Sequence, residues 1–209
     1  STELRDQRGD TALHLAESQG HAATAKLLRQ HTAKLPASGV KSLPLEVDGA
    51  AARGELQPVI EWLEKGGHVD ALAENGAGLL HVAAGGGQLR VAKELLKRGA
   101  SVDLCGTNNV TALMRAAMEG LRAMVRLLLE HKASIDLLEA SGWTALMEAA
   151  YKGHTECVQE LLEAGASTEL SNQRGDTALR HAEAQGQTAT AELLRQHAAT
   201  PPASVATSL

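Results

Sequence analysis

A period of 33 residues organises most of this 209-residue chain. The tripeptide Thr-Ala-Leu occurs at 11–13, 111–113, 144–146 and 177–179, and its last three copies are 33 residues apart. Two other residue types keep the same spacing: glycine at 54, 87, 120, 153 and 186, and leucine at 95, 128, 161 and 194. A fixed period of this length is typical of solenoids, in which each repeat is one supersecondary unit that buries its apolar face against its neighbours.

The recurring residues also predict the local structure of each repeat. The threonine is suited to cap a first helix, because its hydroxyl accepts a backbone N–H of the first turn. The glycine ends that helix, since it adopts positive φ without steric cost. The leucine lies on a second helix and is expected to be buried. Small alanines let neighbouring helices approach closely, which suits a chain that contains no Phe and only three other aromatic residues, two Trp and one Tyr.

The segment 142–154, Gly-Trp-Thr-Ala-Leu-Met-Glu-Ala-Ala-Tyr-Lys-Gly-His, resembles the ankyrin repeat, whose form is G-x-T-P-L-H-x-A-A-x-x-G-H. The resemblance covers about residues 6–200, and it departs from the family in having Ala or Leu where the family has Pro. It implies an all-α ankyrin-repeat solenoid of about six helix-turn-helix repeats, joined by β-hairpin-like loops.

The ends of the chain suggest a larger unit of organisation. Residues 1–43 match residues 167–209 at a constant shift of 166, with 29 of 43 positions identical. We therefore predict that 1–43 is the closing repeat and linker of a near-copy unit, stacked on the next repeat. Residues 44–200 form a five-repeat domain, and 201–209 form a mobile tail. The rival interpretation leaves the first repeat unstacked.

One repeat carries an unusual surface. Trp143 and Tyr151 fall on positions that face partners in ankyrin repeats, namely a hairpin tip and the exposed side of a first helix. We predict a partner-binding patch on the concave face, formed by eight residues: Val110, Met114, Met118, Glu119, Trp143, Met147, Tyr151 and Lys152. The alternative is that the rings and methionines pack on one another as local core. Trp62 is assigned to the core, and Arg115 and Glu148 to a cross-repeat pair.

Composition narrows the function further. A net charge of −5 argues against a nucleic-acid or anionic-membrane partner, because both require clustered cations. No motif for a metal site, a phosphate loop or a catalytic nucleophile is present, so we expect no enzyme activity, no cofactor and no small-molecule substrate. The two cysteines suggest reduced thiols in a cytoplasmic or nuclear protein. The leading hypothesis is a non-catalytic protein–protein interaction scaffold, and the alternative is a structural spacer built from tandem 166-residue units.

Overall fold

The computed structural model describes residues 42–199. The predicted first repeat within 1–43, its stacking and the tail at 201–209 lie outside this range, apart from residues 42 and 43. Within it the chain forms ten α-helices and one 3₁₀ helix. Their bounds are α3 Leu45–Arg53, α4 Leu56–Glu64, α5 Leu79–Gly85, α6 Leu89–Lys97, η1 Thr107–Asn109, α7 Ala112–Met118, α8 Arg122–Glu130, α9 Ala145–Lys152, α10 Thr155–Glu163, α11 Ala178–Ala184 and α12 Thr188–Ala199.

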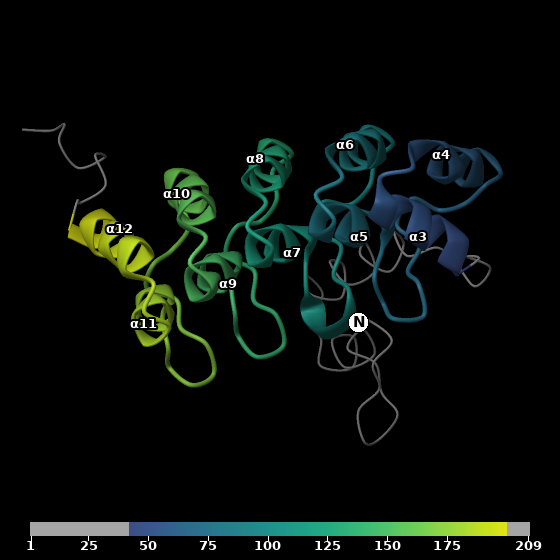
Figure 1. Cartoon of the computed structure of the whole chain (residues 1–209). Helices are drawn as coiled ribbons and strands as arrows, with labels where there is room; N and C mark the ends of the chain where they lie inside the picture. Colours follow the sequence, from purple (N-terminus) through teal and green to yellow (C-terminus); the bar gives the residue numbers. More distant parts are fainter. Residues whose placement is uncertain (1–41, 200–209) are drawn as a thin grey trace, which may run out of the picture. The chain divides into compact units, whose positions relative to one another are not determined.

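The helices form two parallel rows, as Figure 1 shows. The first row contains α3, α5, α7, α9 and α11, and each of these helices packs on the next in the row. The second row contains α4, α6, α8, α10 and α12, each packed on its partner of the same repeat. The predicted all-α repeat solenoid is therefore confirmed for the described residues.

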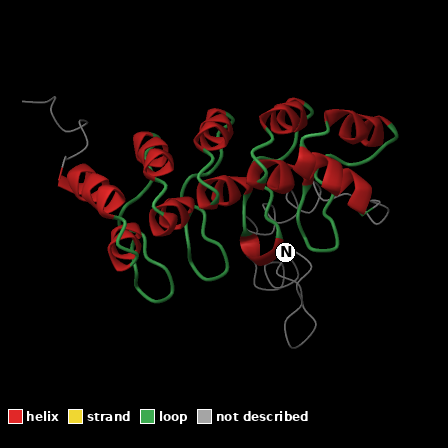
Figure 2. Ribbon diagram, viewed as in Figure 1, coloured by secondary structure: helices red, strands yellow, loops and turns green. Residues whose placement is uncertain are grey.

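The loops between repeats resemble hairpins without forming strands. Figure 2 shows them extending from the first row, on the side away from the second row. The same backbone hydrogen bond closes each loop and recurs at the 33-residue period. The N–H groups of Ala73, Gly106, Glu139 and Asn172 donate to the carbonyls of Ala77, Val110, Trp143 and Asp176, respectively. Two of the loops also form an isolated antiparallel bridge.

The sequence landmarks act as predicted. The hydroxyls of Thr111 and Thr144 accept the N–H of the third residue of α7 and α9, at 3.3 and 3.2 Å. At Gly78, which has no side chain, His81 makes the reciprocal contact instead: its Nδ1 accepts the N–H of Gly78 itself, and its Nε2 donates to the Val110 carbonyl at 3.0 Å. The imidazole therefore ties one repeat to the hairpin of the next.

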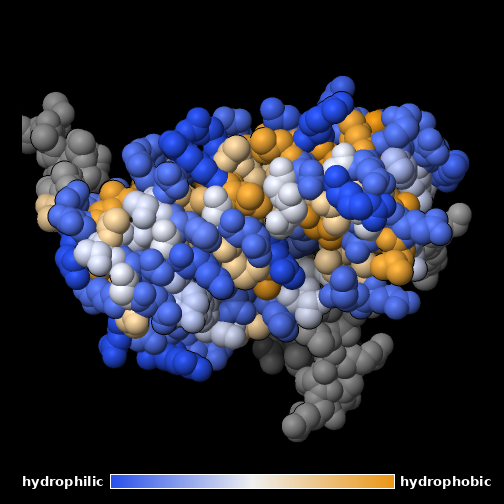
Figure 3. Space-filling view, viewed as in Figure 1, coloured by the Kyte–Doolittle hydropathy of each residue, from blue (hydrophilic) through white to orange (hydrophobic). Residues whose placement is uncertain are grey.

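The core is a continuous layer between the two rows. Leu95, Leu128, Leu161 and Leu194 are at most 1% exposed, and the first-row alanines fill the gaps between helices. Trp62, predicted to be core, is only half-buried, although it packs against this layer. The face drawn in Figure 3 is mostly hydrophilic, with apolar side chains showing between the helices.

Polar contacts also repeat along the stack. Asp70 accepts the backbone N–H and the hydroxyl of Ser101, at 2.9 and 2.6 Å, and Asp103 does the same for Ser134, at 2.8 and 2.6 Å. In the second row, the buried Glu160 of α10 accepts from Arg122 at 2.7 Å and from Arg126 of α8. Each contact joins adjacent repeats and so fixes their register.

Gly120 occupies a conformation and a space that only glycine fits. Its φ is +70°, and a Cβ there would lie 2.6 Å from Nδ1 of His154. The ring has little room to move, because its Nε2 donates to the Met118 carbonyl at 3.1 Å. We expect Gly120→Ala to lower the free energy of unfolding by about 2–4 kcal/mol, from left-handed backbone strain and steric overlap together.

Gly186 supplies the matched control. Its φ is also +70°, but nothing lies within 4 Å of the position of its Cβ. Gly186→Ala should therefore lose only the backbone contribution, about 1 kcal/mol. Urea denaturation of the two variants measures the difference. Equal losses would mean that the His154 ring exerts no steric constraint.

Candidate functional site

Three columns of side chains meet on the hairpin side of the first-row helices. Each column takes one residue per repeat at the 33-residue period. The hairpin column is Val110, Trp143 and Asp176; the mid-helix column is Arg115, Glu148 and His181; the helix-end column is Met118, Tyr151 and Ala184. Because α7, α9 and α11 lie side by side, the columns form a continuous surface across three repeats.

A groove of about 660 Å³ lies on this surface, between the repeats of α9 and α11. We call it the aromatic groove. Its lining residues are Met118, Glu139, Ser141, Trp143, Glu148, Tyr151, Lys152, Arg174, Asp176, His181, Ala184 and Gln185. A smaller pocket of about 140 Å³ adjoins it on the α7 side and shares Met118, Glu139 and Glu148.

Three rings pack together in the aromatic groove. Trp143 stacks on His181, with centroids 4.1 Å apart and planes inclined by 26°. Tyr151 meets Trp143 edge-on, at 5.4 Å and 76°. Both geometries are favourable for aromatic pairs. Trp143 and Tyr151 remain half-exposed, so the cluster offers a preformed apolar surface to solvent.

His181 holds the cluster in place. Its side chain is 8% exposed, and its Nε2 lies 3.0 Å from the side-chain nitrogen of Asn172. Asn172 in turn accepts the backbone N–H groups of Arg174 and Asp176, which fixes the hairpin. Burial lowers the pKa of His181 and so favours the neutral form of the ring that stacks on Trp143. His181 was not predicted from the sequence, although it shares the mid-helix column with Arg115 and Glu148.

The structure brings most of the predicted site residues together, but not all of them. Trp143, Tyr151, Lys152 and Met118 line the aromatic groove, and Val110 and Met114 line the smaller pocket beside it. Glu119 is exposed at the end of α7 and lines neither cavity.

Met114 and Met147 are 3% and 1% exposed, so their expected placement on the open surface was wrong, although Met114 lines the smaller pocket. Both methionines stand at the repeat position of His81, which is also buried. The side chains at this position are covered because each first-row helix packs against its neighbours in the row.

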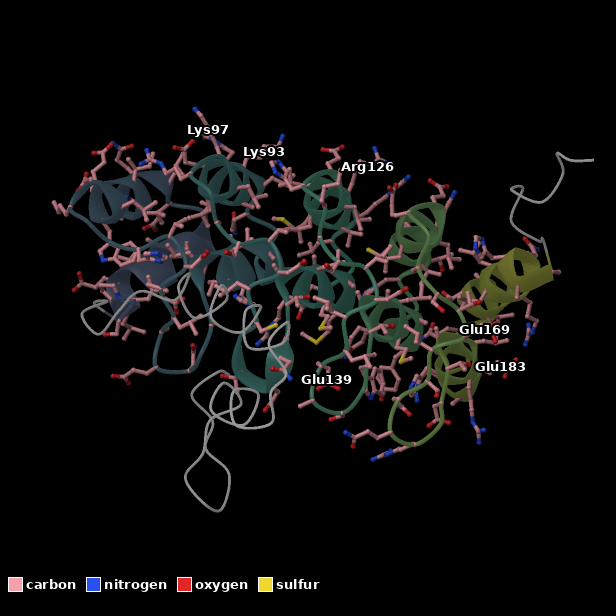
Figure 4. The ribbon with its side chains drawn as sticks, turned by 180° about the vertical axis from the view of Figure 1, so that it is seen from behind. Lys93, Lys97, Arg126, Glu139, Glu169 and Glu183 are labelled. Atoms are coloured by element: carbon pink, nitrogen blue, oxygen red, sulfur yellow. The ribbon has the colours of Figure 1, made fainter. Side chains whose placement is uncertain are left out.

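Two carboxylates lie where the aromatic groove meets the smaller pocket. Glu139 accepts the N–H groups of Ser141 and Trp143 through one oxygen, at 2.7 and 3.1 Å, and so closes its hairpin. Figure 4 shows Glu139 on the hairpin side of the stack, opposite the second-row cations Lys93, Lys97 and Arg126. Glu148 is half-buried, and its carboxylate forms no hydrogen bond or ion pair with any residue in 42–199. The expected Arg115–Glu148 pair does not form.

The surroundings of Glu148 disfavour its charged form. Burial raises the pKa of the Glu148 carboxyl, and the negative charge of Glu139 raises it further. Lys152 and Arg115 offset only part of this effect. The native state therefore holds the proton more tightly than the unfolded chain does. The contribution of Glu148 to stability falls as the pH rises through its native pKa, and it is unfavourable at pH 7.

Removing this charge should stabilise the protein. We expect Glu148→Gln to raise the free energy of unfolding at pH 7 by about 0.5 kcal/mol, a value reduced by solvent screening of a half-exposed group. The gain should vanish near pH 4, where wild-type Glu148 is protonated. Urea titrations at both pH values measure it.

Glu94→Gln is the control, because the hydrogen bond from Arg98, 2.6 Å long, lowers the pKa of Glu94 and predicts the opposite sign. A destabilised Glu148→Gln at pH 7 would contradict the account.

The comparisons with known proteins agree with this architecture. A model of three ankyrin repeats matches residues 49–139 and 132–204, and a single ankyrin-repeat model matches residues 8–38. The chain therefore belongs to the ankyrin-repeat family, whose repeats are generally protein–protein interaction modules. A search of curated proteins returned no match. Among the described residues, no helix is long and apolar enough to cross a membrane.

Proposed function

We propose that this chain is a non-catalytic interaction scaffold that binds a partner protein through its hairpin tips and the exposed side of its first-row helices. The observation that carries the proposal is the ring cluster in the aromatic groove. Tyr and Trp are the residues most often found at interface hot spots, where they fill well-packed positions near the centre. Here both stay half-exposed, on one surface and in fixed geometry.

The position of the cluster supports the same conclusion. The hairpin backbone around Trp143 is tied down by Glu139, and His181 supports its ring from the next repeat. A preorganised surface loses little conformational entropy when a partner binds. Met118 borders the rings and adds a flexible apolar contact that adapts to a partner's shape.

The buried thiol fits a protein that works in a reducing compartment. Cys157 is 1% exposed, and burial raises the pKa of its thiol to about 11. Cys105, by contrast, is exposed. We propose a cytoplasmic or nuclear location, where cysteines are kept as free thiols.

Site-specific photo-crosslinking in cells tests the proposal and captures the partner in the same step. A benzophenone amino acid at Ser141 would lie on the rim of the aromatic groove. The same amino acid at Lys97, exposed on the second row, is the control. The proposal predicts a discrete protein adduct from position 141 and none of that mass from position 97. The same adduct from both positions would mean that binding does not depend on the groove.

A further inference from the structure

The charges of the aromatic groove indicate what kind of side chain it receives. Glu148 lies on α9 one turn before Tyr151, so that both side chains face the same side of the helix. Its carboxylate is half-buried and lacks a hydrogen-bonding partner among the described residues. A desolvated, unpaired charge is unfavourable, and it is relieved when an opposite charge arrives.

The cations already in the groove do not supply that opposite charge. The Lys152 amino group sits 5.9 Å from the centroid of the Tyr151 ring and forms no ion pair with Glu148. Arg174 of the groove and Arg115 of the smaller pocket are exposed and likewise form no ion pair with it. The remaining acid of the groove, Asp176, is bound to Arg180 at 2.8 Å. Glu148, with Glu139 lining the same groove, is thus an acidic side chain that has no ion pair among the described residues.

The rings beside Glu148 favour the same kind of ligand. The faces of Trp and Tyr attract cations, and the attraction is strongest where water is excluded. A lysine or arginine side chain also has an apolar stem that packs along aromatic surface while its charged head reaches a carboxylate. A phosphate or another anion would instead meet Glu139 and Glu148 directly.

We propose that the aromatic groove binds a short segment of a partner protein by taking one of its lysine or arginine side chains, which packs on Trp143 and Tyr151 and pairs with Glu148. This inference rests on the proposed function and specifies the chemistry of the partner. It also gives a reason why the chain keeps a carboxylate that destabilises the free protein: the cost is recovered when the partner's cation binds.

Selection from a random-peptide phage library tests the inference on the full chain. Peptides are selected on wild-type protein, and the best ones are synthesised with each Lys or Arg in turn replaced by norleucine. We expect the selected peptides to share a Lys or Arg, and its replacement to weaken binding to the wild type about ten- to hundredfold. The Glu148→Gln variant should bind the original and the norleucine peptides equally. Glu130→Gln, which removes an exposed acid at the end of α8, should keep the wild-type preference.

The Trp143→Ala/Tyr151→Ala double variant separates the two claims. Peptides that bind the wild type, fail on the double variant and contain no essential cation would overturn the charge inference and leave the proposed function standing. An unchanged preference in Glu148→Gln would also overturn the inference. Selected peptides that bind the double variant as tightly as the wild type, or no selected peptides at all, would overturn both.

Discussion

Replacing Leu128 with alanine is expected to lower the free energy of unfolding by about 3–5 kcal/mol. Leu128 is fully buried in α8, at the centre of the second row. The helix packs against α7, α6 and α10. Because these three helices are also held by contacts with other helices of the stack, the site collapses poorly after the substitution. The cavity that remains adds to the loss of apolar burial.

A leucine on the surface provides the matched control. Leu138 is 46% exposed in the hairpin loop, so Leu138→Ala should cost no more than about 0.5 kcal/mol. Urea denaturation followed by circular dichroism measures both variants, and the slope of the transition reports whether the stack still unfolds as a unit. A loss below about 1 kcal/mol for Leu128→Ala would mean that the two rows are not packed as described.

Trp143→Ala is expected to weaken partner binding by about 2–4 kcal/mol, roughly a 30- to 1,000-fold rise in Kd. The indole forms the centre of the ring cluster and touches both Tyr151 and His181. Removing the indole takes away apolar surface that the partner would contact. It also removes the ring against which Tyr151 and His181 pack. Calorimetric titration with the partner crosslinked at Ser141 gives the value.

Trp62→Ala controls for general loss of stability. Trp62 is also half-buried, but it lies in α4, well outside the repeats that form the aromatic groove. Both substitutions should lower the melting temperature, since both remove a packed indole. Only Trp143→Ala should change the Kd. Equal losses of affinity would show that binding follows stability rather than the groove.

The sequence was sufficient for the fold because each repeat specifies its own structure. Thr144 caps α9, Gly153 ends it with φ at +76°, and Leu161 fills the core above it, all as their spacing predicts. These roles depend on contacts within one repeat or at a fixed offset of 33 residues. The half-burial of Trp62 was missed, because its slot is fully buried in the four later repeats.

The site was only partly predictable, because its contacts cross repeats. The sequence correctly placed Trp143 and Tyr151 at the surface. It also predicted that Met147 is at the surface, although that side chain is buried in the core. It also paired Glu148 with Arg115, whereas the structure leaves that carboxylate without a partner. No motif in the sequence around His181 indicated that it belongs to the site. Its role follows only from the stacking of α11 on α9, which places its ring on Trp143.

The central claim is that the partner contacts the aromatic groove, and the two tryptophans of this chain allow a direct test. A ¹⁵N-labelled sample shows two indole N–H signals, which Trp62→Phe assigns. Addition of the partner captured at Ser141 should shift or broaden the Trp143 signal and leave the Trp62 signal in place. Binding that leaves the Trp143 indole unchanged would contradict the account.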